Sequence, residues 1–321
     1  VLDRAGIAVM FANRVAVGHG LMAPRFRWVP FDDPLLFPLD TRAEAARTPD
    51  TRALYPREAA LLKRYLRTLN MNALPRNLEA YTQAVIWPLL QRQHAAGAPA
   101  IKFEAAYLRP LDFGRPDTAR ATAIYARYVH GGVPTHAEYT VLEDYLFHEI
   151  ARMAGQLGMA VHFHVLYEFG GFYDENGAAP HQLETIANDS TLRGTNFVML
   201  HGGWPLTDET LSLLGKPNMY ADISMMTQLI APSQLAGVLR QWLGEWPSKV
   251  LFGTDAFDSG TAQGWDQGAW LATTSARRAL GLALTGMMRD GEITRARAEQ
   301  LARMVLRENA VKLYHLNLPP Q

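Results

Sequence analysis

The chain contains no cysteine among its 321 residues. Disulfide bonds and thiolate zinc sites are therefore excluded, and any metal ion must be held by histidine, carboxylate or modified lysine side chains. The formal net charge is also zero, because 31 Lys and Arg residues balance 31 Asp and Glu residues. A neutral chain without a basic stripe or an acidic tail argues against nucleic acid as a partner and favours a small-molecule substrate.

Long apolar runs are also lacking. No stretch approaches the roughly 20 apolar residues that a membrane-spanning helix needs, so we expect no membrane partner. The composition, 48% hydrophobic and 19% charged, is that of an ordinary globular protein. No signal peptide is recognisable at the N-terminus, which leaves localisation open with a slight preference for the cytoplasm.

What the sequence does contain is a series of short apolar runs bounded by Gly, Pro or polar residues, which is typical of strands buried on both faces. These runs are Ile7–Ala12, Phe26–Pro30, Ala100–Phe103, Ala160–Val165, Phe197–Leu200, Met219–Ile223 and Lys249–Phe252. Segments with helical period separate most of them, among them Val141–Leu157, His181–Ala187, Pro232–Leu243 and Arg295–Tyr314. Strands that alternate with helices predict an α/β fold with a parallel sheet.

Two α/β architectures fit this alternation, an open doubly wound sheet and a TIM (β/α)8 barrel. A nucleotide-binding open sheet needs a Gly-rich fingerprint, and the glycine pairs at 131–132, 170–171 and 202–203 have the wrong spacing for one. A barrel instead needs polar side chains at the C-terminal ends of several strands. The polar residues in or just beyond the apolar runs are Lys102, His164, His201, Asp222 and Asp255. The sequence therefore predicts a single TIM-barrel domain over residues 1–321.

Seven strands are visible, whereas this barrel has eight. Residues 1–6 have the pattern of a last helical turn entering a strand, so we expect the first strand to precede residue 1. Residues 39–98 form a helical insertion, in which Arg57–Leu69 and Asn77–Gln93 carry helical apolar spacing. The insertion is far longer than a connection of a few residues. We interpret it either as a cap or as helices that pack on the barrel wall or on a partner in a homo-oligomer.

Two histidines lie in one predicted strand, Val161–Val165. Alternate side chains of a strand share a face, so His162 and His164 should point the same way, with His164 nearer the strand end. A single strand histidine is usually a satisfied core residue, whereas two on one face make a functional site an equal alternative. In the next block, four apolar residues end on His201, and the glycines that follow allow a tight turn beside a site.

Asp255 follows the last predicted strand. An aspartate there can ligate a metal or accept a proton, although a single one is more often a helix cap. The combination is more informative, because His164, His201 and Asp255 would converge from the ends of three parallel strands. Imidazole and carboxylate groups suit Zn or a related divalent ion. The three residues therefore predict part of a metal site.

These blocks resemble the amidohydrolase superfamily, in particular its amidohydrolase-2 branch, over nearly the whole chain. The similar segments are Val161–His164, NFVMLHGGWP at 196–205, MYADIS at 219–224, VLFGTDA at 250–256 and the terminal segment 306–314. The resemblance implies that His164 is the fifth-strand metal ligand and His201 the sixth-strand histidine. It implies that Asp255 is the eighth-strand aspartate, which ligates metal and moves protons. A first-strand His-x-His pair belongs to the same pattern and has no match here, which we interpret as truncation.

The resemblance also concerns Lys102, which lies in the strand where some binuclear members carry a carboxylated lysine as a bridging ligand. Glu104 shares its face and is an alternative bridge, and an ion pair of Lys102 with a carboxylate is the competing interpretation. Residues expected on loops at the catalytic face, where they would contact substrate, are Tyr107, Arg109, Glu168 and Trp204. Each of these taken singly fits a structural role as well. Asp222 is expected to orient a histidine.

The resemblance therefore implies a metal-dependent hydrolase in which one or two zinc ions activate a water to cleave an amide, ester or related C–N or C–O bond. Asp255 and His201 would be its catalytic residues. A decarboxylase, lyase or isomerase of the same superfamily, acting on a small carboxylate held by Arg109, is the alternative enzyme. A non-enzymatic barrel that binds a ligand is the third interpretation.

Overall fold

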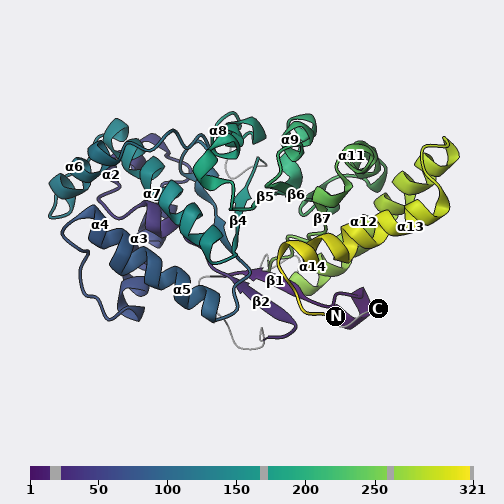
Figure 1. Cartoon of the computed structure of the whole chain (residues 1–321), viewed down its shortest axis with the longest axis horizontal. Helices are drawn as coiled ribbons and strands as arrows, with labels where there is room; N and C mark the ends of the chain where they lie inside the picture. The colour runs from purple at the N-terminus through teal and green to yellow at the C-terminus, as the bar shows by residue number, and fades with distance from the viewer. Residues whose placement is uncertain (15–22, 167–172, 259–263, 319–321) are drawn as a thin grey trace. The chain divides into compact units, whose positions relative to one another are not determined.

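The computed structural model describes residues 1–14, 23–166, 173–258 and 264–318 (Figure 1). The chain divides into two compact units. The N-terminal unit comprises Phe11–His164 and Glu168–Asn196, and the C-terminal unit comprises Val1–Met10, Val165–Tyr167 and Phe197–Gln321. The single-domain assignment made from the sequence stays a prediction.

All seven expected strands are present, but the first two are mostly half-buried and not covered on both faces. They are β1 (Met10–Asn13), β2 (Phe26–Val29), β3 (Ala100–Phe103), β4 (Ala160–His164), β5 (Phe197–Leu200), β6 (Met219–Asp222) and β7 (Val250–Leu251). In the N-terminal unit β3 pairs with β4 in parallel, and β2 leads into a parallel bridge between Phe31 and Lys102. In the C-terminal unit β6 pairs in parallel with both β5 and β7. The prediction of an α/β fold with parallel strands is therefore confirmed.

The segment predicted as a helical insertion is helical. It contains α2 (Arg42–Arg47), α3 (Leu54–Thr68), α4 (Leu78–Tyr81), η2 (Thr82–Ile86) and α5 (Trp87–Ala95), and the short helix η1 (Asp33–Leu36) precedes it. The π-helical turn η2 ends two residues before Pro88, which has no N–H to donate to an α-helical hydrogen bond. A role of these helices as a cap stays a prediction. The other long helices of the N-terminal unit are α6 (Thr118–Tyr128) and α7 (His136–Gln156).

An aromatic cluster fixes which face of β3 and β4 meets helix α7. Phe103 of β3 and Phe163 of β4 stack with ring centroids 6.0 Å apart, and each ring centroid lies 5.5 Å from that of Phe147 of α7. Because side chains alternate along a strand, His162 and His164 lie on the face turned away from α7. The expectation that the two histidines share a face is confirmed.

In the C-terminal unit each strand is followed by helical segments. They are α9 (Thr207–Leu214), α10 (Met226–Leu229), α11 (Pro232–Glu245), α12 (Trp265–Arg289), α13 (Arg295–Arg303), η8 (Met304–Glu308) and α14 (Asn309–Leu313). Helices α11 and α12 run side by side (Figure 1). The buried face of α12 carries five alanines, at 269, 272, 276, 279 and 283, while α11 buries Leu235, Leu239 and Trp242. Small side chains on one helix make room for large ones on the other.

None of the helices within the described residues combines the length and the apolar character needed to cross a bilayer.

Candidate functional site

The register of β3 and β4 places Lys102 opposite His162. Both side chains are buried, and burial together with the charge of Lys102 lowers the pKa of His162 to about 3. His162 is therefore neutral over the physiological pH range. The positive charge of Lys102 also acts to lower the pKa of Asp33. Asp33 lies two residues after Phe31, which is bridged to Lys102.

Asp33 is a buried carboxyl group that the sequence did not mark as a site residue. Its Oδ1 accepts a hydrogen bond of 2.8 Å from the backbone N–H of Glu104. Burial raises its pKa well above the ordinary value, and the neighbouring charges of Glu58 and Glu104 act in the same direction. Glu104, the alternative bridge, thus lies beside Asp33 and Lys102. A buried Asp four residues after a short strand gives no sequence signal, because its neighbours come from distant segments.

His164 ends β4 and is buried. Its Nδ1 lies 3.1 Å from the hydroxyl of Tyr107, and the two ring centroids are 4.4 Å apart. Tyr107 lies on η3 (Ala105–Tyr107), the turn that leaves β3. Since Nδ1 is engaged by Tyr107, Nε2 is the nitrogen with which His164 would bind a metal. Tyr107, expected as a substrate contact, therefore contacts the candidate ligand itself.

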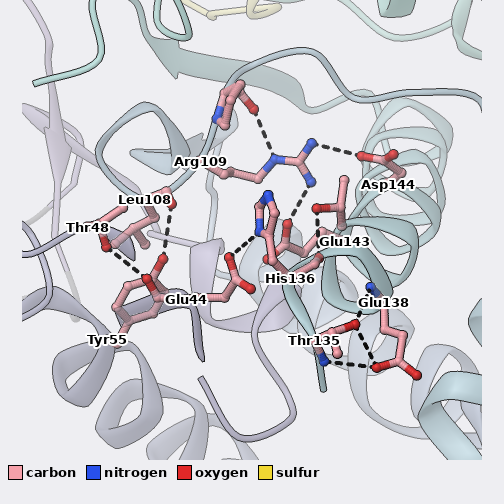
Figure 2. A network of polar contacts seen from close by, with 12 residues as sticks. Glu44, Thr48, Tyr55, Leu108, Arg109, Thr135, His136, Glu138, Glu143 and Asp144 are labelled. Atoms are coloured by element: carbon pink, nitrogen blue, oxygen red, sulfur yellow. Dashed lines mark hydrogen bonds and ion pairs between the residues drawn. The ribbon is translucent and has the colours of Figure 1, made fainter. Parts of the chain in front are cut away.

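Arg109 lies in a buried polar network of the N-terminal unit (Figure 2). Its guanidinium donates to Glu143 Oε2 and to Asp144 Oδ1 of α7, both at 2.8 Å. It also donates to the backbone carbonyls of Pro110 and Asp112, and it lies 4.3 Å from the ring centroid of Phe113. The guanidinium, expected to clamp a substrate carboxylate, thus fastens the loop after β3 to α7.

The pKa values of two carboxyl groups in this network, Glu143 and Asp144, are raised. Burial raises the pKa of Glu143 to about 7, with Glu44 and Asp144 adding to the effect and Arg109 opposing it. Glu44 of α2 pairs through Oε2 with Nδ1 of His136 at 2.8 Å. The Oε1 atoms of Glu44 and Glu143 are buried and accept no hydrogen bond from the described residues.

In the C-terminal unit, His201 directly follows β5 and is buried. Its φ is +67°, and Gly202 and Gly203 follow with φ of +58° and +64°. Three successive left-handed residues turn the chain sharply, as the glycine pair in the sequence predicts. A β-carbon on Gly202 would lie 2.6 Å from atoms of both Met226 and Trp242, so only glycine fits there.

The end of β6 holds His201 in place. Asp222 Oδ1 accepts from the backbone N–H of His201 at 2.8 Å and from the hydroxyl of Ser224 at 2.7 Å. Ser224 Oγ in turn lies 2.9 Å from Nδ1 of His201. Burial raises the pKa of Asp222 to about 6, while these hydrogen bonds oppose the rise. Asp222 thus contacts the backbone of His201 directly and its ring through Ser224, a partner that the sequence did not mark.

Asp255 lies beyond β7, is half-buried and has a φ of +49°. Its backbone carbonyl accepts a hydrogen bond of 3.0 Å from Gln228, and its negative charge raises the pKa of Asp222. Left-handed φ values in residues other than Gly are uncommon and strained, and such strain concentrates at functional sites. His201 and Asp255 both have such a φ value, as do Asn70, Leu166, Met225 and His315. Trp204, the third expected substrate contact, is half-buried on the loop after Gly203.

The candidate metal ligands fall into two sets, His164 and Lys102 in the N-terminal unit and His201 and Asp255 in the C-terminal unit. Within the described ranges, no three His, Asp or Glu side chains are grouped closely enough to hold a metal ion. Imidazole and carboxylate groups are suitable ligands for a divalent cation. In both His164 and His201, Nδ1 lies within hydrogen-bond distance of a hydroxyl group. Glu168 lies outside the described residues.

Comparison with known proteins gives a family match. A family model described as "Amidohydrolase" matches residues 80–316. A segment of 127 residues is 30% identical to Protein fluG of Emericella nidulans, which corresponds to 39% of this chain and 14% of fluG.

Several solved structures have a similar fold. A Lactobacillus casei ATCC 334 protein assigned as a metal-dependent hydrolase is 23% identical, with a TM-score of 0.62 over 79% of this chain and 64% of that chain. Glucuronate isomerase from Caulobacter crescentus is 14% identical, with a TM-score of 0.66 over 99% of this chain and 66% of that chain. Uronate isomerase from Thermotoga maritima is 12% identical, with a TM-score of 0.62 over 98% and 69%.

These identities are low, so the likeness concerns the fold, and it confirms the TIM-barrel fold predicted from the sequence. The chain spans about two thirds of the length of the first two solved structures and a small part of fluG.

Proposed function

The chain belongs to the amidohydrolase family, and from this premise we propose that it is the barrel of a metal-dependent hydrolase. The enzyme would cleave an amide, ester or related C–N or C–O bond of a small molecule. The observation that carries the proposal is the placement of His201 and Asp255, each in a strained left-handed conformation just beyond the end of a parallel strand. In TIM barrels the chemistry lies at these strand ends.

In this proposal His201 and Asp255 of the C-terminal unit serve as metal ligands, and His164 of the N-terminal unit is assigned the same role from the resemblance of its strand to the family pattern. Two imidazoles and a carboxylate suit Zn best among the common ions. When bound, the ion would activate a water and polarise the bond to be cleaved. Lys102, if carboxylated, or Glu104 in its place, would add a ligand for a second ion.

Proton transfer falls to residues of the C-terminal unit. Asp255 is half-buried, so its carboxylate would accept a proton from the attacking water and pass it to the leaving group. His201 is the alternative base. Tyr107 and Trp204 are the side chains that we propose to contact substrate, because both are half-buried on loops that leave strand ends. Arg109 is left out of this set because Glu143 and Asp144 already engage its guanidinium.

The same observation supports one of the two enzymatic alternatives. A decarboxylase or an isomerase of a small carboxylate was expected to use Arg109 as the clamp for that carboxylate. Since the Arg109 side chain is buried in its ion pairs, hydrolysis is the proposal that we retain. An assay for CO2 release beside the hydrolase assays separates the two.

The test removes the ligands one at a time in the full-length protein. We expect His164→Ala and Asp255→Ala to lose bound metal, measured by elemental analysis, and turnover on a panel of amides and esters. The matched controls are His181→Ala and Asp208→Ala, which change exposed residues of the same types. Metal content and activity that stay at the wild-type level in both His164→Ala and Asp255→Ala would overturn the proposal.

A further inference from the structure

Asp222 and Ser224, at the end of β6, form a buried polar pair beside His201. The three residues are between 4% and 8% exposed, so water does not compete strongly for their hydrogen bonds. One oxygen, Asp222 Oδ1, accepts three hydrogen bonds: from the backbone N–H of His201 at 2.8 Å, from the backbone N–H of Ser224 at 3.1 Å and from the hydroxyl of Ser224 at 2.7 Å.

The direction of these bonds determines where the protons lie. Backbone N–H groups only donate, so Asp222 Oδ1 acts as an acceptor toward all its neighbours. A serine hydroxyl has a single proton, and Ser224 gives that proton to Asp222. Toward Nδ1 of His201, 2.9 Å away, Ser224 Oγ therefore presents a lone pair. A hydrogen bond between the two atoms requires that Nδ1 carries the proton.

We propose that Ser224, held by Asp222, keeps neutral His201 in the tautomer that has its proton on Nδ1. The other ring nitrogen, Nε2, then presents a lone pair. The opposite tautomer would place two lone pairs 2.9 Å apart in a buried site, so that Nδ1 of His201 and Ser224 Oγ could form no hydrogen bond with each other. Ser224 and Asp222 are thus positioning residues that act through His201.

The strand register explains how residues 23 positions apart meet. Met199 of β5 pairs with Ala221 of β6, so the chain segments that leave the two strands begin side by side. Gly253, beyond β7, provides the space for the pair. A β-carbon at Gly253 would lie 2.3 Å from Asp222 Oδ2 and 2.8 Å from Cβ of Ser224. Residues that follow three consecutive strands, β5, β6 and β7, therefore surround the imidazole of His201 and its partners.

The consequence for chemistry rests on the proposed function. An Nε2 lone pair is what His201 needs to ligate a divalent ion or to accept a proton, and a histidine locked in the other tautomer would do neither through that atom. The tautomer itself can be measured without metal or substrate. Its test is therefore independent of whether the chain proves to be a hydrolase.

The experiment is a long-range 1H–15N correlation spectrum of the histidine rings in metal-free, 15N-histidine-labelled protein. His201→Gln identifies the His201 signals. We expect the neutral Nδ1–H form to exceed the Nε2–H form roughly tenfold or more in the wild type, and this excess to be lost in Ser224→Ala. Ser224→Thr, which keeps a hydroxyl, should restore it, and Ser212→Ala, on the exposed side of α9, should leave it unchanged.

A wild-type His201 that is mainly Nε2–H would overturn the inference, and this measurement needs no variant of Ser224 to fold. An unchanged tautomer ratio in folded Ser224→Ala would overturn the role of Ser224. If the wild-type tautomer is as expected but His164→Ala and Asp255→Ala keep metal and activity, the proposed function fails while this inference stands.

Discussion

The hydroxyl of Tyr107 lies 3.1 Å from Nδ1 of His164, and the two rings are tilted by 41° with their centroids 4.4 Å apart. Two residues further along the chain, Arg109 fastens the same loop to α7 through Glu143 and Asp144. The loop that leaves β3 therefore presents a hydroxyl to the candidate ligand at the end of β4. Groups in this position set the orientation and the basicity of a metal-binding imidazole.

Tyr107→Phe should weaken metal binding roughly tenfold, because it removes the hydroxyl from His164 while keeping the ring. Metal affinity measured by competition with a chelator is the appropriate readout. Tyr173→Phe is the matched control: its ring centroid lies 5.9 Å from that of Tyr107, and its hydroxyl has no hydrogen-bond partner among the described residues. Equal affinities in the two variants would refute a positioning role for Tyr107.

Arg109→Met should lower the free energy of unfolding by about 3 kcal/mol, because it leaves Glu143 and Asp144 without their buried cation. Urea denaturation measures the loss. In Arg127→Met the pair with Glu138 is exposed, and the change should stay below about 1 kcal/mol. If Arg109 instead clamps a substrate carboxylate, its variant will raise KM and leave stability almost unaltered.

Glu143→Gln should reduce the pH dependence of stability. Burial raises the pKa of Glu143 from 4.5 to about 7, so between these values the folded state holds a proton that the unfolded state lacks. The free energy of unfolding must then fall as pH rises through this window, by up to about 3 kcal/mol for this group. The amide cannot ionise, so Glu143→Gln should remove that part of the decline.

The measurement is the free energy of unfolding from urea denaturation at pH values from about 5 to about 8, which cover the range over which Glu143 titrates. Comparison with the wild type cancels the contributions of other buried groups, such as Asp32 and His162. Glu245→Gln, at an exposed position of α11, serves as the control and should follow the wild-type curve. A Glu143→Gln curve parallel to that of the wild type would mean that Glu143 is ionised throughout.

Gly202→Ala should cost roughly 2–4 kcal/mol, because it combines a left-handed φ of +58° with a β-carbon 2.6 Å from Met226 and Trp242. It should also weaken metal binding, since the turn that places His201 has to shift. Gly237→Ala in the middle of α11 meets nothing within 4 Å and should stabilise the protein by about 0.5–1 kcal/mol. Equal thermal stability of the two variants would contradict this account of the turn.

The sequence by itself was enough to predict the strands and to name the candidate site residues at their ends. Short apolar runs predicted all seven strands, because strands covered on both faces are mostly apolar, even though β3 and β4 also carry Lys102 and His162 in their interiors. The two-residue period of a strand was enough to place His162 and His164 on one face. Similarly, the His-Gly-Gly block at 201–203 predicted a sharp turn, because only glycine adopts left-handed φ values without strain.

The tertiary structure decided which residues act together. Arg109 reads in the sequence as a free cation on a loop, and only the packing of that loop against α7 shows that Glu143 and Asp144 engage it. Ser224 reaches His201 across 23 positions, and Asp33 reaches Glu104 across 71. Periodicity and composition describe neighbours along the chain, whereas partners such as these are set by strand register and helix packing, which bring distant segments together.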